Sequence, residues 1–228
     1  MSVEVPLRST VVSGLDHVVL AGPDLAAAID HVEALTGVRA APGGRHPRGT
    51  ANALIAFTRG GRRVRQYLEV IGPDAEAGWT ADRVDTFGID RLEGPRVVTF
   101  SARPTDIEAA VAAARAAGVP FQDVEPLSRR TPDGRELAWR LARPEDGETH
   151  PPFLIDWGAT PHPGLERLPT LELVSLRRLV PDVEAESARL RALGVAVGTG
   201  DEAVEVVAAE EAGFELDVRV GDCRIRLR

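Results

Sequence analysis

The side chain best suited to chemistry at neutral pH is a histidine in a loop rich in glycine and proline. His46 lies in the segment Pro42 to Gly49, which leads into an apolar run. Loops of this kind commonly carry binding residues, and an imidazole titrates near neutral pH. His46 is therefore a candidate general acid or base. The alternative is a surface histidine beside a turn.

Short motifs that would assign a reaction directly are absent from the sequence. It has no glycine-rich phosphate loop, no pair of cysteines at metal-ligand spacing and no G-x-S-x-G segment. Such motifs supply the backbone donors, thiolates or strained serine on which phosphoryl transfer, metal binding by cysteine and serine hydrolysis depend. These activities and a nucleotide cofactor are therefore poorly supported.

Charge and composition favour a small-molecule partner in a reducing compartment. The net charge of −8 argues against a nucleic-acid or anionic-membrane surface. Cys223 is the single cysteine and cannot form an internal disulfide. Residues Met1 to Ser13 contain no continuous apolar stretch of the kind found in signal peptides. We therefore expect a cytoplasmic protein.

The elements that must position any site follow a recurring pattern. An apolar run, a proline, a helix-forming stretch and a glycine occur in this order three times, with the helical stretches at Leu25 to Leu35, Ile107 to Ala117 and Val183 to Leu193. Proline near the first turn and glycine past the last turn are typical of helix boundaries. Short alternating runs follow each helix and indicate strands. Each copy therefore predicts a βαβββ module.

Two irregular segments separate the three copies. The segment Asp74 to Gly94 is largely polar, and the segment Pro161 to Pro169 is rich in proline. We therefore expect an α+β fold of three tandem βαβββ modules, at residues 14–74, 94–160 and 168–228. An unpaired sheet edge on the third module needs a partner. That module is expected to pair with a second copy in a homodimer or to cover a cavity of its own chain.

Within residues 14–160 the chain resembles the vicinal-oxygen-chelate superfamily and, more specifically, its glyoxalase-like branch. The segments that carry the resemblance are Leu15-Asp16-His17-Val18-Val19, Gly43-Gly44-Arg45-His46-Pro47, Gly49-Thr50-Ala51-Asn52-Ala53-Leu54, Tyr67-Leu68-Glu69-Val70-Ile71 and Phe153-Leu154-Ile155-Asp156-Trp157-Gly158. The resemblance implies that two modules pair edge to edge and enclose a cup. It also implies that a metal, where present, is held by the first and last strands of each module.

The alternation of apolar and polar side chains along the strands can be compared with that arrangement. A strand packed on its helix shows apolar side chains on one face only, which places Tyr67 and Glu69 in the cup and Leu68 and Val70 on the helix side. In the closing strand of the second module the same rule puts Asp156 in the cup. The residues expected on the helix side there are Phe153, Ile155 and Trp157.

The resemblance thus implies a metal site made of His17, Glu69 and Asp156. One imidazole and two carboxylates suit a divalent ion such as Mn, Fe, Zn or Mg. The fourth position carries Thr99, which is a poor ligand. The alternative is that His17 has its hydrogen bonds satisfied within the strand and that both carboxylates line a wet cleft.

Other polar side chains on the expected cup face are candidates for substrate binding. Asn52 suits an orienting amide, or equally a cap for the preceding loop. Tyr67 is the one aromatic side chain placed clearly on that face. Arg140 suits a clamp for a substrate carboxylate, or equally an internal partner for a nearby acidic residue. The Arg129-Arg130 doublet precedes a turn and is expected on the solvated rim.

Three functions are compatible with these residues. In the first, a metal in the cup polarises the oxygens of a small substrate, and Glu69 or His46 moves a proton, as in a lyase or an isomerase. In the second, the cup binds and sequesters a small molecule without chemistry. The third is an extradiol-type dioxygenase, which requires His46 to join the metal ligands because such iron sites use two histidines and one carboxylate.

Overall fold

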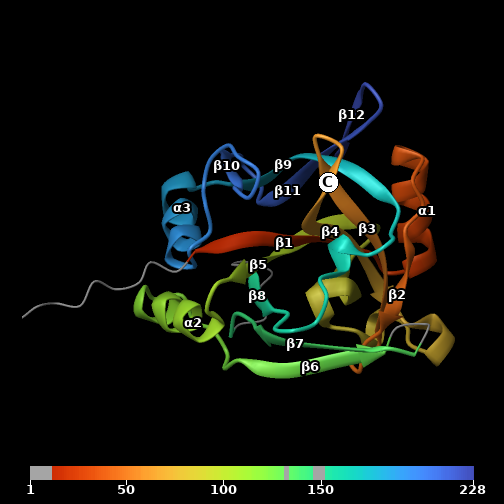
Figure 1. The fold of residues 1–228 in the computed structure, drawn as a ribbon, viewed down its shortest axis with the longest axis horizontal. Coiled ribbons are helices and arrows are strands. Elements are labelled where there is room, and N and C mark those ends of the chain that lie inside the picture. Colours follow the sequence, from red (N-terminus) through yellow and green to blue (C-terminus); the bar gives the residue numbers. More distant parts are fainter. Residues whose placement is uncertain (1–11, 131–133, 146–151) are drawn as a thin grey trace, which may run out of the picture.

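The computed structural model describes residues 12–130, 134–145 and 152–228. The first group of elements is β1 (Ser13–Ala21), α1 (Leu25–Thr36), β2 (Ala41–Arg45), β3 (Thr50–Arg59) and β4 (Arg62–Pro73). The second is β5 (Arg96–Pro104), α2 (Ile107–Ala116), β6 (Glu125–Arg130), β7 (Glu136–Ala142) and β8 (Phe153–Asp156). The third is β9 (Thr170–Val180), α3 (Val183–Ala192), β10 (Glu205–Ala208), β11 (Gly213–Val220) and β12 (Cys223–Leu227). The order of strand, helix and three strands therefore recurs, and the α+β class is confirmed (Figure 1).

Short 3-10 segments occupy the connections between these groups. They are η1 (Ala75–Ala77), η2 (Ala81–Arg83), η3 (Thr86–Arg91) and η4 (Pro163–Leu165). The first three lie in the segment expected to be irregular, and η4 lies in the proline-rich segment. Both segments therefore carry some ordered turns.

Each α-helix begins at an aspartate that caps it. The side chains of Asp24, Asp106 and Asp182 accept hydrogen bonds from the backbone N–H groups of Ala27, Ala109 and Ala185, at 2.9 to 3.0 Å. Such a bond satisfies one of the backbone donors that a helix start leaves unpaired. The recurring proline and acidic residue of the sequence thus mark three helix starts.

The first two groups join through their opening strands. In the first group β1 lies between β4, to which it is parallel, and β5, to which it is antiparallel. In the second group β5 is parallel to β8, which pairs in turn with β7. The described strands form one sheet that passes through β3, β4, β1, β5, β8, β7 and β6 in that order. The two groups therefore meet edge to edge, as the resemblance implied.

The third group attaches at the other end of this sheet. Its strand β9 is parallel to β3 over three residue pairs, and β11 is antiparallel to β9. Phe214 of β11 packs against Phe100 of β5 with the ring centroids 6.1 Å apart. Figure 1 shows β9, β11 and β12 at the top of the view and β6 and β7 at the bottom. The third group therefore completes an edge of the sheet within its own chain.

One core cluster contains buried side chains from all three groups, including Val18, Phe100 and Leu216. The division at residues 14–74, 94–160 and 168–228 therefore stays an interpretation of the repeat, because the groups share one sheet and one core. No helix in the described part of the chain is long and apolar enough to cross a membrane. The homodimer and the cytoplasmic location stay predictions.

Candidate active site

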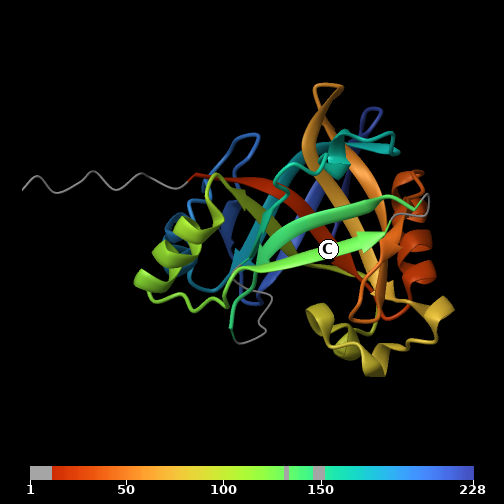
Figure 2. The ribbon, with the colours of Figure 1, turned by 60° about the horizontal axis from the view of Figure 1, so that its bottom comes forward.

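A pocket of about 280 Å³ opens between the first and second groups of elements. We call its two sides the first wall and the second wall. The first wall consists of His17, His46, Asn52, Tyr67 and Glu69. The second wall consists of Leu127, Arg129, Trp139, Leu141, Phe153, Ile155 and Trp157. Its strands β6 and β7 come forward in Figure 2.

Among the described residues, none after Trp157 lines this pocket. The expectation that the third module covers the cavity is therefore wrong for the described part of the chain. The physical reason is that its strand β9 pairs with β3, while its apolar side chains join the core on the other face of the sheet.

The first wall follows from alternation along β1 and β4. Tyr67 and Glu69 point into the pocket, and the intervening Leu68 and the next residue, Val70, lie in the core. Because β1 is parallel to β4 with His17 opposite Tyr67, the imidazole stacks on the phenol ring with centroids 4.5 Å apart. Burial, followed by the charges of Asp16 and Glu69, raises the pKa of Tyr67, so this phenol remains protonated.

The carboxylate of Glu69 is held on both oxygens and is 7% exposed. The side-chain amide of Asn52 donates a hydrogen bond to Oε1, and Nε2 of His17 lies 3.6 Å from Oε2. The orientation of the amide is fixed because its Oδ1 accepts a hydrogen bond from the backbone N–H of Gly44 at 2.9 Å. Asn52 therefore caps the loop and also orients Glu69.

A buried carboxylate behind His17 was not singled out in the sequence. Asp16 is fully buried and accepts hydrogen bonds from Nδ1 of His17 at 2.7 Å, Nε2 of His162 at 3.0 Å and the guanidinium of Arg103 at 3.0 Å. The indole N–H of Trp157 lies 3.3 Å from both oxygens. The signal available was an acidic residue directly before His17 inside an apolar run.

Asp16 fixes which nitrogen of His17 faces the pocket. Burial alone would raise the pKa of Asp16, but the hydrogen bonds and charges of His162 and His17 hold it well below its ordinary value. The ionised carboxylate accepts a hydrogen bond from the Nδ1–H of His17 and so leaves Nε2 directed at Glu69. His162, in the segment expected to be a linker, is 3% exposed and thus belongs to the support of the site.

His46 lies at the other side of Asn52. Its Nδ1 is 2.9 Å from the hydroxyl of Thr50, and its Nε2 is 3.5 Å from Nδ2 of Asn52. Burial lowers the pKa of His46, and the negative charge of Glu69 opposes part of that shift. Because Nδ2 of Asn52 can only donate, Nε2 of His46 is the acceptor, and the ring proton lies on Nδ1, which donates to the hydroxyl of Thr50. A neutral His46 is then an acceptor toward Asn52 and a donor toward Thr50.

The second wall reverses the face expected for β8. Phe153, Ile155 and Trp157 line the pocket, and Leu154 lies in the core on the helix side. The expectation that Asp156 lies in the cup is therefore wrong. The rule that apolar side chains face the helix fails here because this side of the pocket is itself apolar. Because β8 has four residues, its alternation is too short to show which of its two faces lies toward the pocket.

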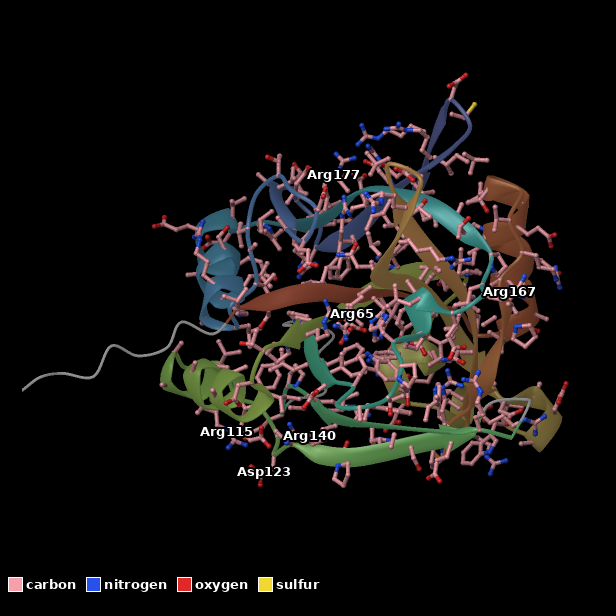
Figure 3. The ribbon with its side chains drawn as sticks, in the orientation of Figure 1. Arg65, Arg115, Asp123, Arg140, Arg167 and Arg177 are labelled. Atoms are coloured by element: carbon pink, nitrogen blue, oxygen red, sulfur yellow. The ribbon has the colours of Figure 1, made fainter. Side chains whose placement is uncertain are left out.

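Arg140 lies outside the pocket for the same reason. Its neighbours Trp139 and Leu141 face the pocket, so Arg140 points to the opposite face, where its Nε donates to Asp156 at 3.1 Å and a terminal nitrogen contacts Glu108. Figure 3 shows Arg140 near the α2 end of the β6 and β7 strands. The clamp role expected for Arg140 is wrong, and the alternative of an internal pair with Asp156 holds.

Arg129 contributes one positive charge to the second wall, and Arg143, which pairs with Glu125, lies on the same side of the pocket. Its residue is 7% exposed, and one terminal nitrogen donates to the backbone oxygen of Gly43 at 2.9 Å. The expectation of a solvated rim is therefore wrong for Arg129, because alternation with Leu127 turns its side chain inward. The side chain of Arg130 lies outside the described part of the structure.

The family model of the glyoxalase-like domain matches residues 15–194. This chain belongs to the glyoxalase-like domain family. The match includes the whole pocket and continues through β9 and α3, beyond the segments that carried the resemblance. The family is of the vicinal-oxygen-chelate type, in agreement with the sequence motifs. No curated protein matches the chain.

Solved structures share the fold of this glyoxalase-like protein at low sequence identity. A crystal structure of a hypothetical protein from Staphylococcus aureus has a TM-score of 0.63 and 12% identity, and the match covers 95% of this chain and 99% of that chain. The fold similarity therefore includes the third group of elements. A methylmalonyl-CoA epimerase of Streptomyces coelicolor has a TM-score of 0.46 and 22% identity, with 67% of this chain and 99% of that chain covered. The epimerase of Mycobacterium tuberculosis has a TM-score of 0.39 and 21% identity, with 66% and 91% covered.

Divalent metals are common in this superfamily, so the donor set of this glyoxalase-like protein matters. Only His17 and Glu69 of the expected ligands meet in the pocket, since Asp156 lies on the opposite face and Thr99 supplies no imidazole or carboxylate. Within the described residues no three His, Cys, Asp or Glu side chains are grouped so as to hold an ion. The amide of Asn52 lies between His46 and Glu69. These residues do not fit a chelate site or the ligand set of a dioxygenase iron.

Proposed function

We propose that this protein catalyses proton transfer at a carbon atom next to a carbonyl group, as in an isomerase, epimerase or lyase, with Glu69 as the base. The observation that carries this proposal is the pocket-facing carboxylate of Glu69, held by Asn52 on one oxygen and faced by His17 on the other. A carboxylate held in position within a pocket is a common general base for removing a proton from carbon.

The neighbouring side chains support the two halves of the reaction. Glu69 takes the proton from the carbon, and Asn52 keeps the accepting oxygen in position. The negative charge that develops on the substrate oxygen is stabilised by donors in the pocket, for which the phenol O–H of Tyr67 is suited because its raised pKa keeps it protonated. Nε2 of His17 is close enough to Oε2 to exchange the proton with Glu69 before it returns to the substrate.

This proposal uses only groups that the chain itself supplies. Within the described residues, the side chains that could bind a metal ion here are the imidazole of His17 and the carboxylate of Glu69 itself. The amide of Asn52 already donates a hydrogen bond to that carboxylate. Elemental analysis of protein purified without a metal-affinity tag tests this part directly. We expect far less than one equivalent of Mn, Fe, Zn or Mg, with the same content in Glu69→Gln. Stoichiometric metal that disappears in that variant would overturn the metal-free route.

Exchange of carbon-bound hydrogen with deuterium oxide tests the proton-transfer step. The probes are carbonyl compounds with an acidic C–H bond, namely phenylpyruvate, a 3-oxo ester and a 1,3-diketone, followed by proton NMR. We expect catalysed exchange in at least one probe, and about a thousandfold slower exchange in Glu69→Gln. The control is Glu136→Gln, an exposed carboxylate of β7 that does not line the pocket. No catalysed exchange in any probe would contradict the proposal.

A second candidate is a non-catalytic protein that sequesters a small molecule. The observation in its favour is the second wall, in which Trp139, Phe153 and Trp157 supply far more aromatic surface than the sequence indicated. Aromatic walls bind planar ligands through large contact areas with little loss of side-chain entropy. Tight binding of a probe with no exchange of its hydrogens would favour this candidate over catalysis.

A further inference from the structure

The second wall contains a buried positive charge without an acidic partner in the described part of the chain. Arg129 is 7% exposed, and within the described residues its hydrogen bond is to the backbone oxygen of Gly43. The charge is felt inside the pocket: burial and then Arg129 both lower the pKa of His46, whereas for Tyr67 the larger effect of burial raises the pKa and Arg129 lowers it. A buried guanidinium without a counter-charge is unfavourable, since desolvation is not repaid. A bound anion would supply the missing charge.

Two further polar atoms in the same pocket lack a hydrogen-bond partner among the described residues. They are the indole nitrogen of Trp139 and the hydroxyl of Thr86, and both side chains line the pocket. The indole N–H is a donor only. A buried donor that stays unpaired carries a desolvation penalty, so Trp139 also requires an acceptor from outside the protein.

Strand pairing brings Arg129 and Trp139 together. In the β6 and β7 pair Leu127 lies opposite Trp139, and Arg129 lies opposite Leu137. Arg129 and Trp139 are therefore diagonal neighbours on one face, a separation that long and aromatic side chains bridge. An oxyanion placed between them can accept from the guanidinium and from the indole N–H at once.

The rest of the pocket determines which anion fits. Phe153, Ile155 and Trp157 present an apolar and aromatic surface next to these two donors. Glu69 on the facing wall carries a negative charge, which repels a carboxylate and leaves the Arg129 end as the favourable place for it. A small inorganic anion would leave the aromatic surface unfilled.

We propose that the pocket binds a carboxylate with a planar apolar body, whose carboxylate contacts Arg129 and the indole N–H of Trp139 while its body packs on Phe153 and Trp157. This substrate class rests on the proposed function, because it places the carbon to be deprotonated on the Glu69 side. Phenylalkanoic acids and their 2-oxo derivatives are of this chemical class.

The test is equilibrium binding of phenylacetate, phenylacetamide and acetate, followed by the fluorescence of the pocket tryptophans. We expect phenylacetate to bind at roughly millimolar concentration or below, with much weaker binding of the amide and of acetate. Arg129→Gln should reduce phenylacetate affinity at least ~30-fold and leave the amide unchanged. The matched control is Arg140→Gln, which removes an arginine from the opposite face of the same strand pair and should change neither affinity.

A second variant separates recognition from structure. Arg129→Lys keeps the positive charge and should retain a preference for phenylacetate over its amide, with weaker binding because the planar fork is lost. Equal affinity for acid and amide, unchanged phenylacetate affinity in folded Arg129→Gln, or no binding of phenylacetate at millimolar concentration would each overturn the proposal. Because this assay scores binding alone, bound phenylacetate without catalysed exchange would reject the proton-transfer function and leave the carboxylate site standing.

Discussion

The two walls of the pocket come from the same order of elements but carry different chemistry. On the first wall the closing strand β4 presents Glu69, which is connected to Asn52 and His17. On the second wall the closing strand β8 presents Phe153 and Ile155. The polar side chains of the first wall mostly hydrogen-bond to one another, whereas on the second wall the described part of the chain offers no acceptor to the indole N–H of Trp139 and no acidic partner to Arg129. In the proposed function, one wall carries out proton transfer and the other recognises the substrate.

Because of this difference, the two walls of the pocket need not carry the same kinds of functional residue. In a pocket made from two similar modules, each position on one wall has a counterpart on the other, and the counterpart is free to diverge. Here the counterparts Phe153 and Ile155 on β8 are apolar and offer water no hydrogen bonds, although Arg129 and Arg143 line the same side of the pocket. A drier site strengthens each electrostatic interaction inside it.

The largest effect is expected from breaking the support behind the first wall. Asp16→Asn removes a fully buried charge that four cationic or donor groups share, and we expect it to lower the free energy of unfolding by about 3 kcal/mol. The pKa of Asp16 is lower in the folded state than its ordinary 3.8, so its stabilisation is complete above that pH and is lost as the pH falls further. Urea unfolding at neutral and acid pH measures both quantities.

The matched control for this prediction is Asp156→Asn. Asp156 is partly exposed and pairs with Arg140 on the outer face, so its loss should change stability by about 0 to 1 kcal/mol. Equal losses in the two variants would show that Asp16 is an ordinary ion-pair residue and would remove the distinction between the support of the first wall and the surface.

A smaller effect is expected from removing one donor of the second wall. Trp139→Phe keeps a ring in place and deletes the N–H group that lacks a partner. We expect phenylacetate affinity to fall about tenfold, because a hydrogen bond to a charged group is lost. The midpoint temperature of thermal unfolding should be unchanged or slightly raised. Trp79→Phe, at a tryptophan that does not line the pocket, should leave the affinity unchanged. An unaltered affinity in Trp139→Phe would show that its N–H group does not contact the carboxylate.

The smallest expected effect is the contribution of His46, on the first wall, to the pH dependence of stability. Burial lowers the pKa of His46 below its ordinary 6.5, so the unfolded chain binds a proton more readily than the folded protein. Stability should therefore rise with pH up to about 6.5 and show no further contribution from His46 above it. In His46→Gln, the midpoint temperature of thermal unfolding, measured from pH 5 to 8, should lack this part of its rise with pH. The same slope in the variant would assign it to another group.

The sequence predicted much of the fold because its signals are local. Helix caps at Asp24, Asp106 and Asp182 and the alternation in β4 depend on neighbouring residues only, and the structure has helices and pocket-facing side chains at these places. The partner of the third module depends on which edges meet in space. No local pattern contains that information.

The second wall was predicted poorly for a different reason. Alternation separates two faces of a strand but does not say which face is the pocket when both are apolar, so β8 was assigned in reverse and Asp156 was misplaced. The burial of Arg129 and of His162 likewise depends on segments distant in the sequence. Tertiary packing, and not residue type, decided these positions.

The most direct test of the division between the walls compares phenylpyruvate binding and deuterium exchange in wild type, Glu69→Gln and Arg129→Gln. We predict that Glu69→Gln binds phenylpyruvate as wild type does but exchanges its hydrogens about a thousandfold more slowly. We predict the converse for Arg129→Gln, with weak binding but a near-normal exchange rate at saturation. Wild-type exchange in Glu69→Gln, or a lost saturated rate with unchanged binding in Arg129→Gln, would contradict the assignment of chemistry to one wall and recognition to the other.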